Sequence, residues 1–168
     1  MLAPACAKAD VVDSAANGFT LKITLTVQST PADVYKHLVH NVGDWWSSAH
    51  TFSGDAHNLS IDDKAGGCFC EKLADGGGVQ HMVVVNSQPG QKLVMRGSLG
   101  PFQTMGTEGS MSIALSKDAE GTKLEVTFAV GGYMAGGMDK LAAPVNGVLT
   151  DQFTRLKNYV EHGTPAAK

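Results

Sequence analysis

The chain reads FTLKITLTVQSTPAD from Phe19 to Asp33, and this stretch decides the fold. As far as Gln28, apolar residues alternate with polar ones, which is the period of a strand with one buried face. Directly afterwards, Thr30 is a good N-cap, Pro31 suits the first helical position and Asp33 is an acid of the first turn. We therefore predict a half-buried strand that is followed at once by a capped helix.

Turn signals divide the rest of the chain into short elements. Gly43 ends the first helix, and Asp44-Trp45-Trp46 starts a second short helix or turn. Strands are expected near residues 56–61, 68–73, 79–87, 91–99, 110–116 and 122–130, with turns rich in Gly, Pro and Asp between them. A helical stripe of apolar residues predicts a long amphipathic helix over Asp139–His162, with a short turn at Met138–Ala142 because of Pro144.

This order of elements predicts an α+β fold with one long C-terminal helix across a curved antiparallel sheet. Such a pair cannot pack solidly everywhere, so we expect a cavity between sheet and helix. The 168 residues fit a single domain over residues 18–163. Residues 1–17 are expected to form a loose arm or a signal-peptide remnant, and residues 164–168 a tail.

Composition argues against several classes of function. The net charge is −3 and there is no basic run, so we expect no nucleic-acid partner. No apolar stretch reaches the roughly 18 residues of a membrane helix, so no membrane span is expected. Phosphate-loop, nucleophile-elbow and metalloprotease motifs are missing, and His50 and His57 lack zinc-type spacing. We expect neither a cofactor nor a metal, and nothing indicates an oligomeric state.

The N-terminus suggests export. Ala5-Cys6-Ala7 fits the small-x-small pattern of a signal-peptide cleavage site. We expect a periplasmic or secreted protein, and the alternative is a cytoplasmic protein with an Ala-rich start.

The order of motifs resembles the START-like (SRPBCC) superfamily, and within it the branch of polyketide cyclases/dehydrases and heat-shock-ATPase-activator homologues. The resemblance covers residues 19–162 and rests on Thr30–Tyr35, Gly43–Trp46, Gly66–Glu71 and the helix over Leu141–Val160. It implies a helix-grip fold: a seven-stranded antiparallel sheet wrapped around a long C-terminal helix, with two short helices after the first strand. It also implies a hydrophobic ligand pocket, in a superfamily that ranges from lipid carriers to cyclases.

Glu71 and His81 are the strongest candidates for chemistry. A hairpin closed symmetrically about Gly76 would place them opposite one another, and a second hairpin closed about Pro89 would set Gly97 beside His81 and leave room for a ligand. A carboxylate that orients an imidazole is a usable general base. The competing interpretation is a buried polar pair that only satisfies itself.

The same register predicts the buried face of the sheet. It would carry Phe69, Leu73, Val79, Val83, Val85, Leu93 and Met95, with Met82 and Val84 on the opposite face. Cys68 and Cys70 also share a face, where they would pack as small apolar residues or form a strained disulfide.

Further residues are predicted to contact a ligand. Trp45, Trp46, His50 and Phe52 are expected to gate the cavity, with Phe102 and Met105 on the opposite lip. Tyr133 lies in a glycine-rich hinge formed by Gly131-Gly132 and Gly136-Gly137 that could move the last helix. The full set of predicted ligand-binding residues is Trp45, Trp46, His50, Phe52, Phe69, Glu71, His81, Met95, Phe102, Met105, Tyr133, Val145 and Leu149.

Three functions remain open from the sequence. The first is binding of a small hydrophobic or amphipathic molecule, lipid-like or polyketide-like. The second is a cyclase, dehydratase or hydrolase that uses Glu71 and His81 with a loop tyrosine such as Tyr133. The third is a protein-interaction module like the ATPase-activator homologues, which would have a filled core and an exposed apolar patch.

Overall fold

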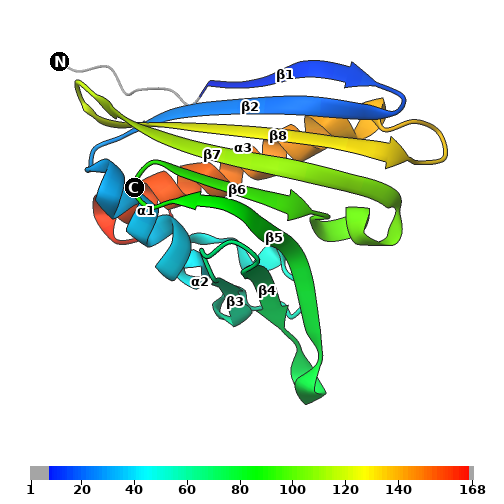
Figure 1. The fold of residues 1–168 in the computed structure, drawn as a ribbon, viewed down its shortest axis with the longest axis horizontal. Coiled ribbons are helices and arrows are strands. Elements are labelled where there is room, and N and C mark those ends of the chain that lie inside the picture. The colour runs from blue at the N-terminus through cyan, green and yellow to red at the C-terminus, as the bar shows by residue number, and fades with distance from the viewer. Residues whose placement is uncertain (1–7, 167–168) are drawn as a thin grey trace.

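A computed structural model describes residues 8–166, in which one antiparallel sheet is covered on one face by helices (Figure 1). The strands are β1 (Lys8–Ala15), β2 (Gly18–Val27), β3 (Leu59–Ile61), β4 (Cys68–Lys72), β5 (Gly78–Gln88), β6 (Lys92–Gly97), β7 (Gly106–Asp118) and β8 (Gly121–Tyr133). The helices are α1 (Pro31–His40), α2 (Val42–Trp45) and α3 (Asp139–His162). Short 3-10 turns are η1 (Ser48–His50), η2 (Ala56–Asn58), η3 (Ala74–Gly76) and η4 (Gly100–Thr104).

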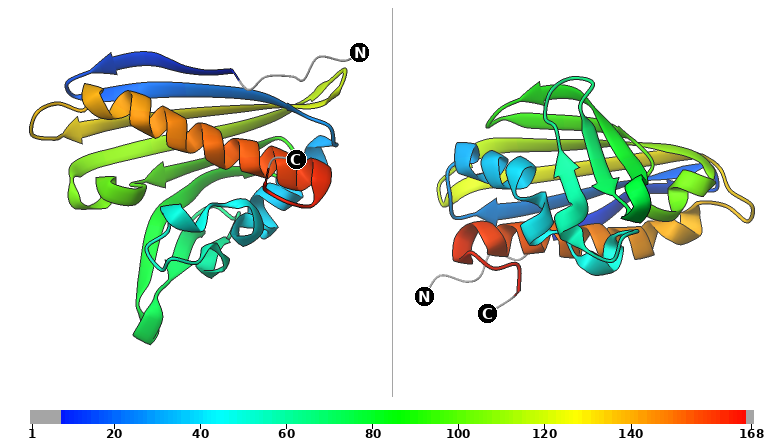
Figure 2. Two further views of the ribbon diagram at one scale, coloured as in Figure 1. Left: turned by 180° about the vertical axis from the view of Figure 1, so that it is seen from behind. Right: turned by 90° about the horizontal axis from the view of Figure 1, so that it is seen from below.

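The sheet has the order β1-β2-β8-β7-β6-β5-β4-β3. Figure 2 shows α3 lying along one face of this sheet, with α1 and α2 beside the C-terminal half of the helix. This α+β arrangement fits the predicted helix-grip fold approximately, but the described residues form eight strands instead of seven.

The additional strand is β1, which lies in the segment predicted to be a loose arm. β1 pairs with β2 from Lys8, opposite Thr24, to Ala15, opposite Gly18. Its side chains are almost all exposed, so no alternation of apolar and polar residues marks it in the sequence. The predicted cleavage site at Ala5-Cys6-Ala7 lies outside the described residues.

The first helix begins as predicted. The Thr30 hydroxyl accepts a hydrogen bond from the backbone N–H of Asp33 at 3.2 Å, which satisfies one of the free donors of the first turn. The helix buries Val34, Tyr35, Leu38 and Val39. The capped start of α1 is therefore confirmed.

The last helix has the predicted bounds but not the predicted break. α3 runs continuously from Asp139 to His162, with Pro144 inside it. A proline early in a helix removes a single backbone hydrogen bond, and Pro144 is itself exposed, so water can replace that bond. The helix ends at Gly163, whose φ of 71° makes a left-handed cap.

The predicted register of the β4–β5 and β5–β6 hairpins is wrong. The first closes about Asp75 (φ 58°) instead of Gly76, and the second about Gly90 (φ 75°) instead of Pro89. Gly76 has positive φ as well (80°), so positive φ marks these turns without deciding which residue lies at the centre. With the first hairpin centred on Asp75, Glu71 pairs with Val79, not with His81.

Two irregularities in the pairing also change which residues of β5 face the interior. The pairing shifts between Gln80 and Met82 on one side of the strand, and between Val84 and Asn86 on the other. Each bulge adds a residue, so the alternation of faces is interrupted. His81, Met82 and Val84 are buried, whereas Val83 is only half-buried and Val85 is exposed, contrary to prediction.

Gly97 has a structural role in the pairing of β5 with β6. It pairs with Met82, and a Cβ at this position would lie 2.5 Å from the carbonyl oxygen of His81. The glycine therefore permits close approach of β6 to the bulge. Gly97 also borders a pocket of about 350 Å³ together with His81.

Gly147 offers a test of helix propensity. Gly147 lies inside α3, and a Cβ there would have no neighbour within 4 Å, so packing does not require a glycine. Gly147→Ala should therefore raise the free energy of unfolding by about 0.5–1 kcal/mol, because alanine loses less backbone entropy. Urea denaturation followed by circular dichroism measures this.

The matched control is Gly97→Ala, which should lower the free energy of unfolding by more than about 1 kcal/mol because φ is 150° and backbone atoms block the site. Equal effects of the two substitutions would contradict this account of both glycines.

Candidate functional site

A cavity of about 530 Å³ lies between α3 and the sheet. Its walls come from the segment after α2, from β3, β4, β5 and β8, from η4 and from the N-terminal half of α3. The lining residues are Trp46, Ala49, His50, Thr51, Phe52, Leu59, Phe69, His81, Leu99, Gly100, Pro101, Phe102, Phe128, Leu141, Pro144, Val145, Val148 and Leu149. The lining is predominantly aromatic and aliphatic, and its polar side chains are those of His50, Thr51 and His81.

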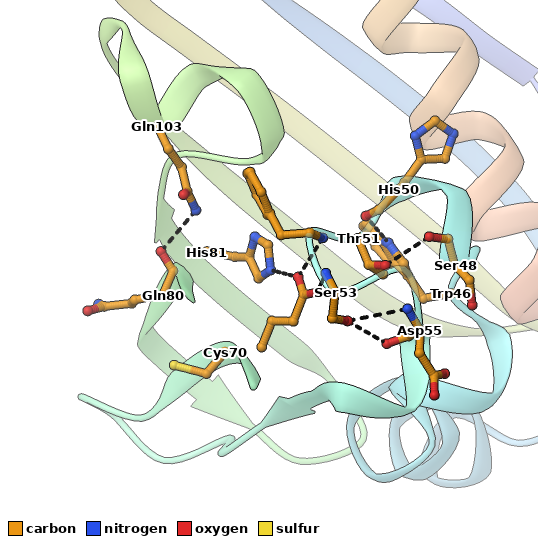
Figure 3. A network of polar contacts seen from close by, with 12 residues as sticks. Trp46, Ser48, His50, Thr51, Ser53, Asp55, Cys70, Gln80, His81 and Gln103 are labelled. Carbon is orange, nitrogen blue, oxygen red and sulfur yellow. Dashed lines mark hydrogen bonds and ion pairs between the residues drawn. The ribbon is translucent and has the colours of Figure 1, made fainter. Parts of the chain in front are cut away.

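Glu71 is not among the lining residues but contacts one of them, His81; it is a buried carboxylate, with 2% of its surface exposed. One oxygen, Oε1, accepts a hydrogen bond from the backbone N–H of Ser53 at 2.5 Å. The other, Oε2, accepts from the backbone N–H of Phe52 at 3.1 Å and lies 3.0 Å from Nε2 of His81 (Figure 3). Glu71 thus joins β4, the loop after η1 and the bulge of β5.

Contact between Glu71 and His81 was predicted, but it arises differently. The two residues are diagonal neighbours across β4 and β5, since Val79 faces Glu71 directly. Both side chains point to the same face of the sheet, and diagonal neighbours of this kind are within reach of long side chains. His81 is the extra residue of the bulge, which brings the next residue, Met82, to the buried side as well.

The protonation states follow from burial and from these contacts. Burial raises the pKa of Glu71, but hydrogen bonds from Ser53, Phe52 and His81 outweigh it and hold the pKa below its ordinary 4.5. Burial also lowers the pKa of His81 below 6.5, although the hydrogen bond and charge of Glu71 oppose this. At neutral pH the site therefore contains a carboxylate and a neutral imidazole.

Aromatic rings surround the imidazole. The ring centroid of Phe69 lies 5.1 Å from that of His81, and the centroid of Phe52 lies 5.9 Å away. Phe69 is buried, whereas 55% of Phe52 is exposed. His81 is itself 5% exposed, and its Nδ1 has no hydrogen-bond partner.

Cys68 and Cys70 form a disulfide, with their Cα atoms 5.3 Å apart. The sequence left open whether these cysteines pack as small apolar residues or form a disulfide, and in the structure they form a disulfide. The β4–β5 pairing shifts between Phe69 and Cys70, so β4 is irregular at this bridge. Both cysteines are half-buried, and Cys70 directly precedes Glu71 in the chain.

The structure brings some of the predicted ligand-binding residues to the cavity and leaves others away from it. Those that line it are Trp46, His50, Phe52, Phe69, His81, Phe102, Val145 and Leu149. Trp45 is a core residue whose indole N–H donates to the carbonyl oxygen of His37, and Met95 is buried within the sheet. Met105 lines a second pocket of about 350 Å³ with Gln80, Arg96 and Gln103, and His81 borders this pocket as well as the cavity.

Tyr133 does not belong to the cavity. It is 76% exposed and ends β8. Gly131 and Gly132, predicted as part of a hinge, are strand residues paired with Glu108 and Thr107 of β7. Of the predicted hinge, Gly136 and Gly137 alone lie in a turn before α3.

Sequence reasoning missed part of the wall. Leu59, Leu99, Phe128, Leu141 and Val148 line the cavity as well. Leu141 and Val148 belong to the apolar stripe of α3, which does carry a signal, because the stripe must face either the sheet or the cavity. For Leu59 and Leu99 the loops around them decide the position, and nothing local indicates it.

Within residues 8–166, no three His, Cys, Asp or Glu side chains come together in a way that could hold a metal ion. No helix in that part of the chain is long and apolar enough to cross a membrane.

Comparison with known proteins identifies a shared fold. No family model and no curated protein matches the chain. An uncharacterised protein from Rhizobium leguminosarum is similar with a TM-score of 0.63 and 17% identity, over 93% of this chain and 98% of the other. EF2215 from Enterococcus faecalis, of unknown function, has a TM-score of 0.60 and 13% identity, over 96% and 80%.

DynU16, a protein in the dynemicin biosynthetic locus, matches with a TM-score of 0.62 and 21% identity. The match covers 87% of this chain but 48% of DynU16, so the chain corresponds to about half of that protein. At these identities the likeness defines the class of fold, an α+β helix-grip-like fold, and nothing finer.

Removal of the Glu71 carboxylate should remove the hydrogen bonds that hold the loop after η1 in place. Glu71→Ala leaves the N–H groups of Phe52 and Ser53 and the imidazole of His81 without an acceptor, which should lower the free energy of unfolding by about 3 kcal/mol. Amide hydrogen exchange at Phe52 and Ser53 should also accelerate. The matched control is Glu108→Ala, an exposed carboxylate beside Arg96, which should change stability by less than about 0.5 kcal/mol.

Stability should depend on pH through His81 and Glu71. Since the folded pKa of His81 lies below its ordinary 6.5, the unfolded chain takes up the proton first, and stability falls as pH drops below about 6.5. Since the pKa of Glu71 is depressed below 4.5, its contribution is present above that pH and is lost as pH falls through the folded pKa.

His81→Phe should flatten the decline of stability just below pH 6.5, as measured by urea unfolding at a series of pH values. Parallel profiles for wild type and variant between neutral pH and the onset of the Glu71 titration would refute the assignment of a neutral His81.

Proposed function

We propose that the protein binds a small hydrophobic or amphipathic molecule in the cavity between the sheet and α3. The observation that carries this proposal is an unfilled, largely apolar space of about 530 Å³ lined by aromatic and aliphatic side chains. Sites for small organic ligands are commonly of roughly 300–1,000 Å³ with such a lining and few polar groups. Water inside an apolar space of this kind finds few hydrogen-bond partners, so binding of an apolar molecule in its place is favoured.

The class of ligand is lipid-like or polyketide-like. Five aromatic side chains, those of Trp46, Phe52, Phe69, Phe102 and Phe128, line the space and suit flat or ring-containing molecules. The similarity in fold to DynU16, a protein from a biosynthetic locus, is compatible with this proposal. A protein-interaction module with a filled core is less well supported, because the interior contains this cavity.

An enzyme of the cyclase or dehydratase kind is the second candidate, and the Glu71–His81 pair favours it. A neutral imidazole held by a carboxylate at the edge of a largely apolar cavity is suited to remove a proton. The predicted role of Tyr133 has no support, since its side chain is exposed and does not line the cavity.

An oxidising compartment is proposed as the place of action. The Cys68–Cys70 disulfide supports this proposal, because disulfides persist mainly in extracytoplasmic environments.

Filling the cavity should abolish binding. Val145 and Val160 are both half-buried residues of α3, but Val145 alone lines the cavity. Val145→Trp should weaken binding of the neutral dye N-phenyl-1-naphthylamine more than tenfold, because the indole would occupy the space of the guest. Dye fluorescence in a titration measures the affinity, with thermal unfolding to show that the variant is folded.

Val160→Trp is the control and should leave dye affinity within about twofold of wild type. If both variants bind like wild type, or if wild type shows no saturable binding of the dye or of any co-purified molecule in native mass spectrometry, the proposed function is wrong.

A further inference from the structure

We propose that Nδ1 of His81 is the recognition point of the cavity and accepts a hydrogen bond from a hydroxyl group of the ligand. The cavity would then select a neutral, mostly apolar molecule that carries one hydroxyl group, over a hydrocarbon of the same shape and over a carboxylate. This inference rests on the proposed function and specifies the ligand class of the same site.

The first step is the position of the imidazole proton. Oε2 of Glu71 is 3.0 Å from Nε2 of His81 and already accepts a hydrogen bond from the N–H of Phe52, while Oε1 accepts from Ser53. A carboxylate surrounded by donors in this way acts as an acceptor, so Nε2 must carry the proton. In a neutral imidazole the other nitrogen then has a free lone pair. Glu71 is thus a positioning residue that makes Nδ1 an acceptor.

The second step is that this acceptor has no partner. Nδ1 of His81 is buried and forms no hydrogen bond. The side chain as a whole is 95% buried and lines the cavity. Buried polar atoms are normally satisfied, and an unsatisfied one carries a cost in free energy. A ligand that brings a donor to Nδ1 removes this cost, whereas a hydrocarbon does not.

The third step is the charge of the surroundings. None of the residues that line the 530 Å³ cavity, within the part of the chain that the structure describes, is a lysine or an arginine. Arg96, which borders the second pocket with His81, is already paired with Glu108 at 3.7 Å. A carboxylate ligand would lose its hydration without a cationic partner and would lie near the buried carboxylate of Glu71. Both effects disfavour an acidic guest and leave a neutral hydroxyl as the matching group.

The fourth step is access. Of the two phenylalanine rings beside His81, Phe69 is packed in the core while Phe52 is 55% exposed at the cavity wall. The side chain of Phe52 can therefore rotate outwards without opening the core, while Glu71 still holds its backbone N–H. We assign Phe52 as the movable ring that yields to the ligand hydroxyl.

The test compares three probes of one shape: 2-naphthol, naphthalene and 2-naphthoate, measured by displacement of N-phenyl-1-naphthylamine at pH 7.5. With wild type, 2-naphthol should bind about tenfold more tightly than naphthalene, the effect of one ordinary hydrogen bond, and 2-naphthoate should bind weakest. In His81→Phe the difference between 2-naphthol and naphthalene should disappear, with naphthalene affinity retained. His57→Phe, which changes an exposed histidine outside the cavity lining, should keep the difference.

Nitrogen-15 NMR of histidine-labelled wild-type protein gives a second measurement that does not depend on the folding of His81→Phe. The resonance of the unprotonated nitrogen of His81 should move on addition of 2-naphthol and stay in place with naphthalene. In Glu71→Ala the free protein should show a mixture of the two imidazole tautomers, which a purely structural role of Glu71 would not produce.

Equal affinities of 2-naphthol and naphthalene in wild type, or an Nδ1 that carries the proton, would overturn the inference while leaving the proposed function intact. A preference for 2-naphthoate would overturn it too. Failure of the dye and of all three probes to bind would count against the proposed function and this inference together.

Discussion

The buried carboxylate of Glu71 is the interaction on which the site depends. A carboxylate without partners would be very costly in the interior, and this one receives the N–H groups of Phe52 and Ser53 and the imidazole of His81. It therefore fixes the loop after η1 as a wall of the cavity. It also fixes the orientation and proton of His81. One charged group thus links the shape of the site to its chemistry.

The bulges of β5 are the second constraint, because they decide which side chains enter the interior. A regular strand would direct alternate residues inwards, but His81 and Met82 are neighbours in sequence and both are buried. Bulges also bend a strand, and Figure 1 shows β5 curving along its length, towards β4 and β3. The sheet and the straight α3 then diverge, and aromatic side chains enclose the remaining space without filling it.

Long segments with a clear period were predictable from the sequence. The pairing of one segment with another was not. The strand of Phe19–Gln28, the cap at Thr30 and the bounds of α3 follow from local chemistry and from periods of two and 3.6 residues. β1 has no such period, since both of its faces are exposed and only its backbone pairing with β2 holds it. The contact of Glu71 with His81 was predicted from an incorrect register. The contact is nevertheless present, because side chains of diagonal neighbours on adjacent strands can also reach one another.

By itself the sequence determined the order of elements, the apolar stripe of α3 and the residue types available for chemistry. These depend on side-chain period and on capping, which act within a few residues. Only the tertiary structure decided the register of β4 and β5, the burial of Met82 and Val84, and the unpartnered Nδ1 of His81. The reason is physical: turn centres at Asp75 and Gly90 and the bulges between them depend on packing across the sheet, which no single segment encodes.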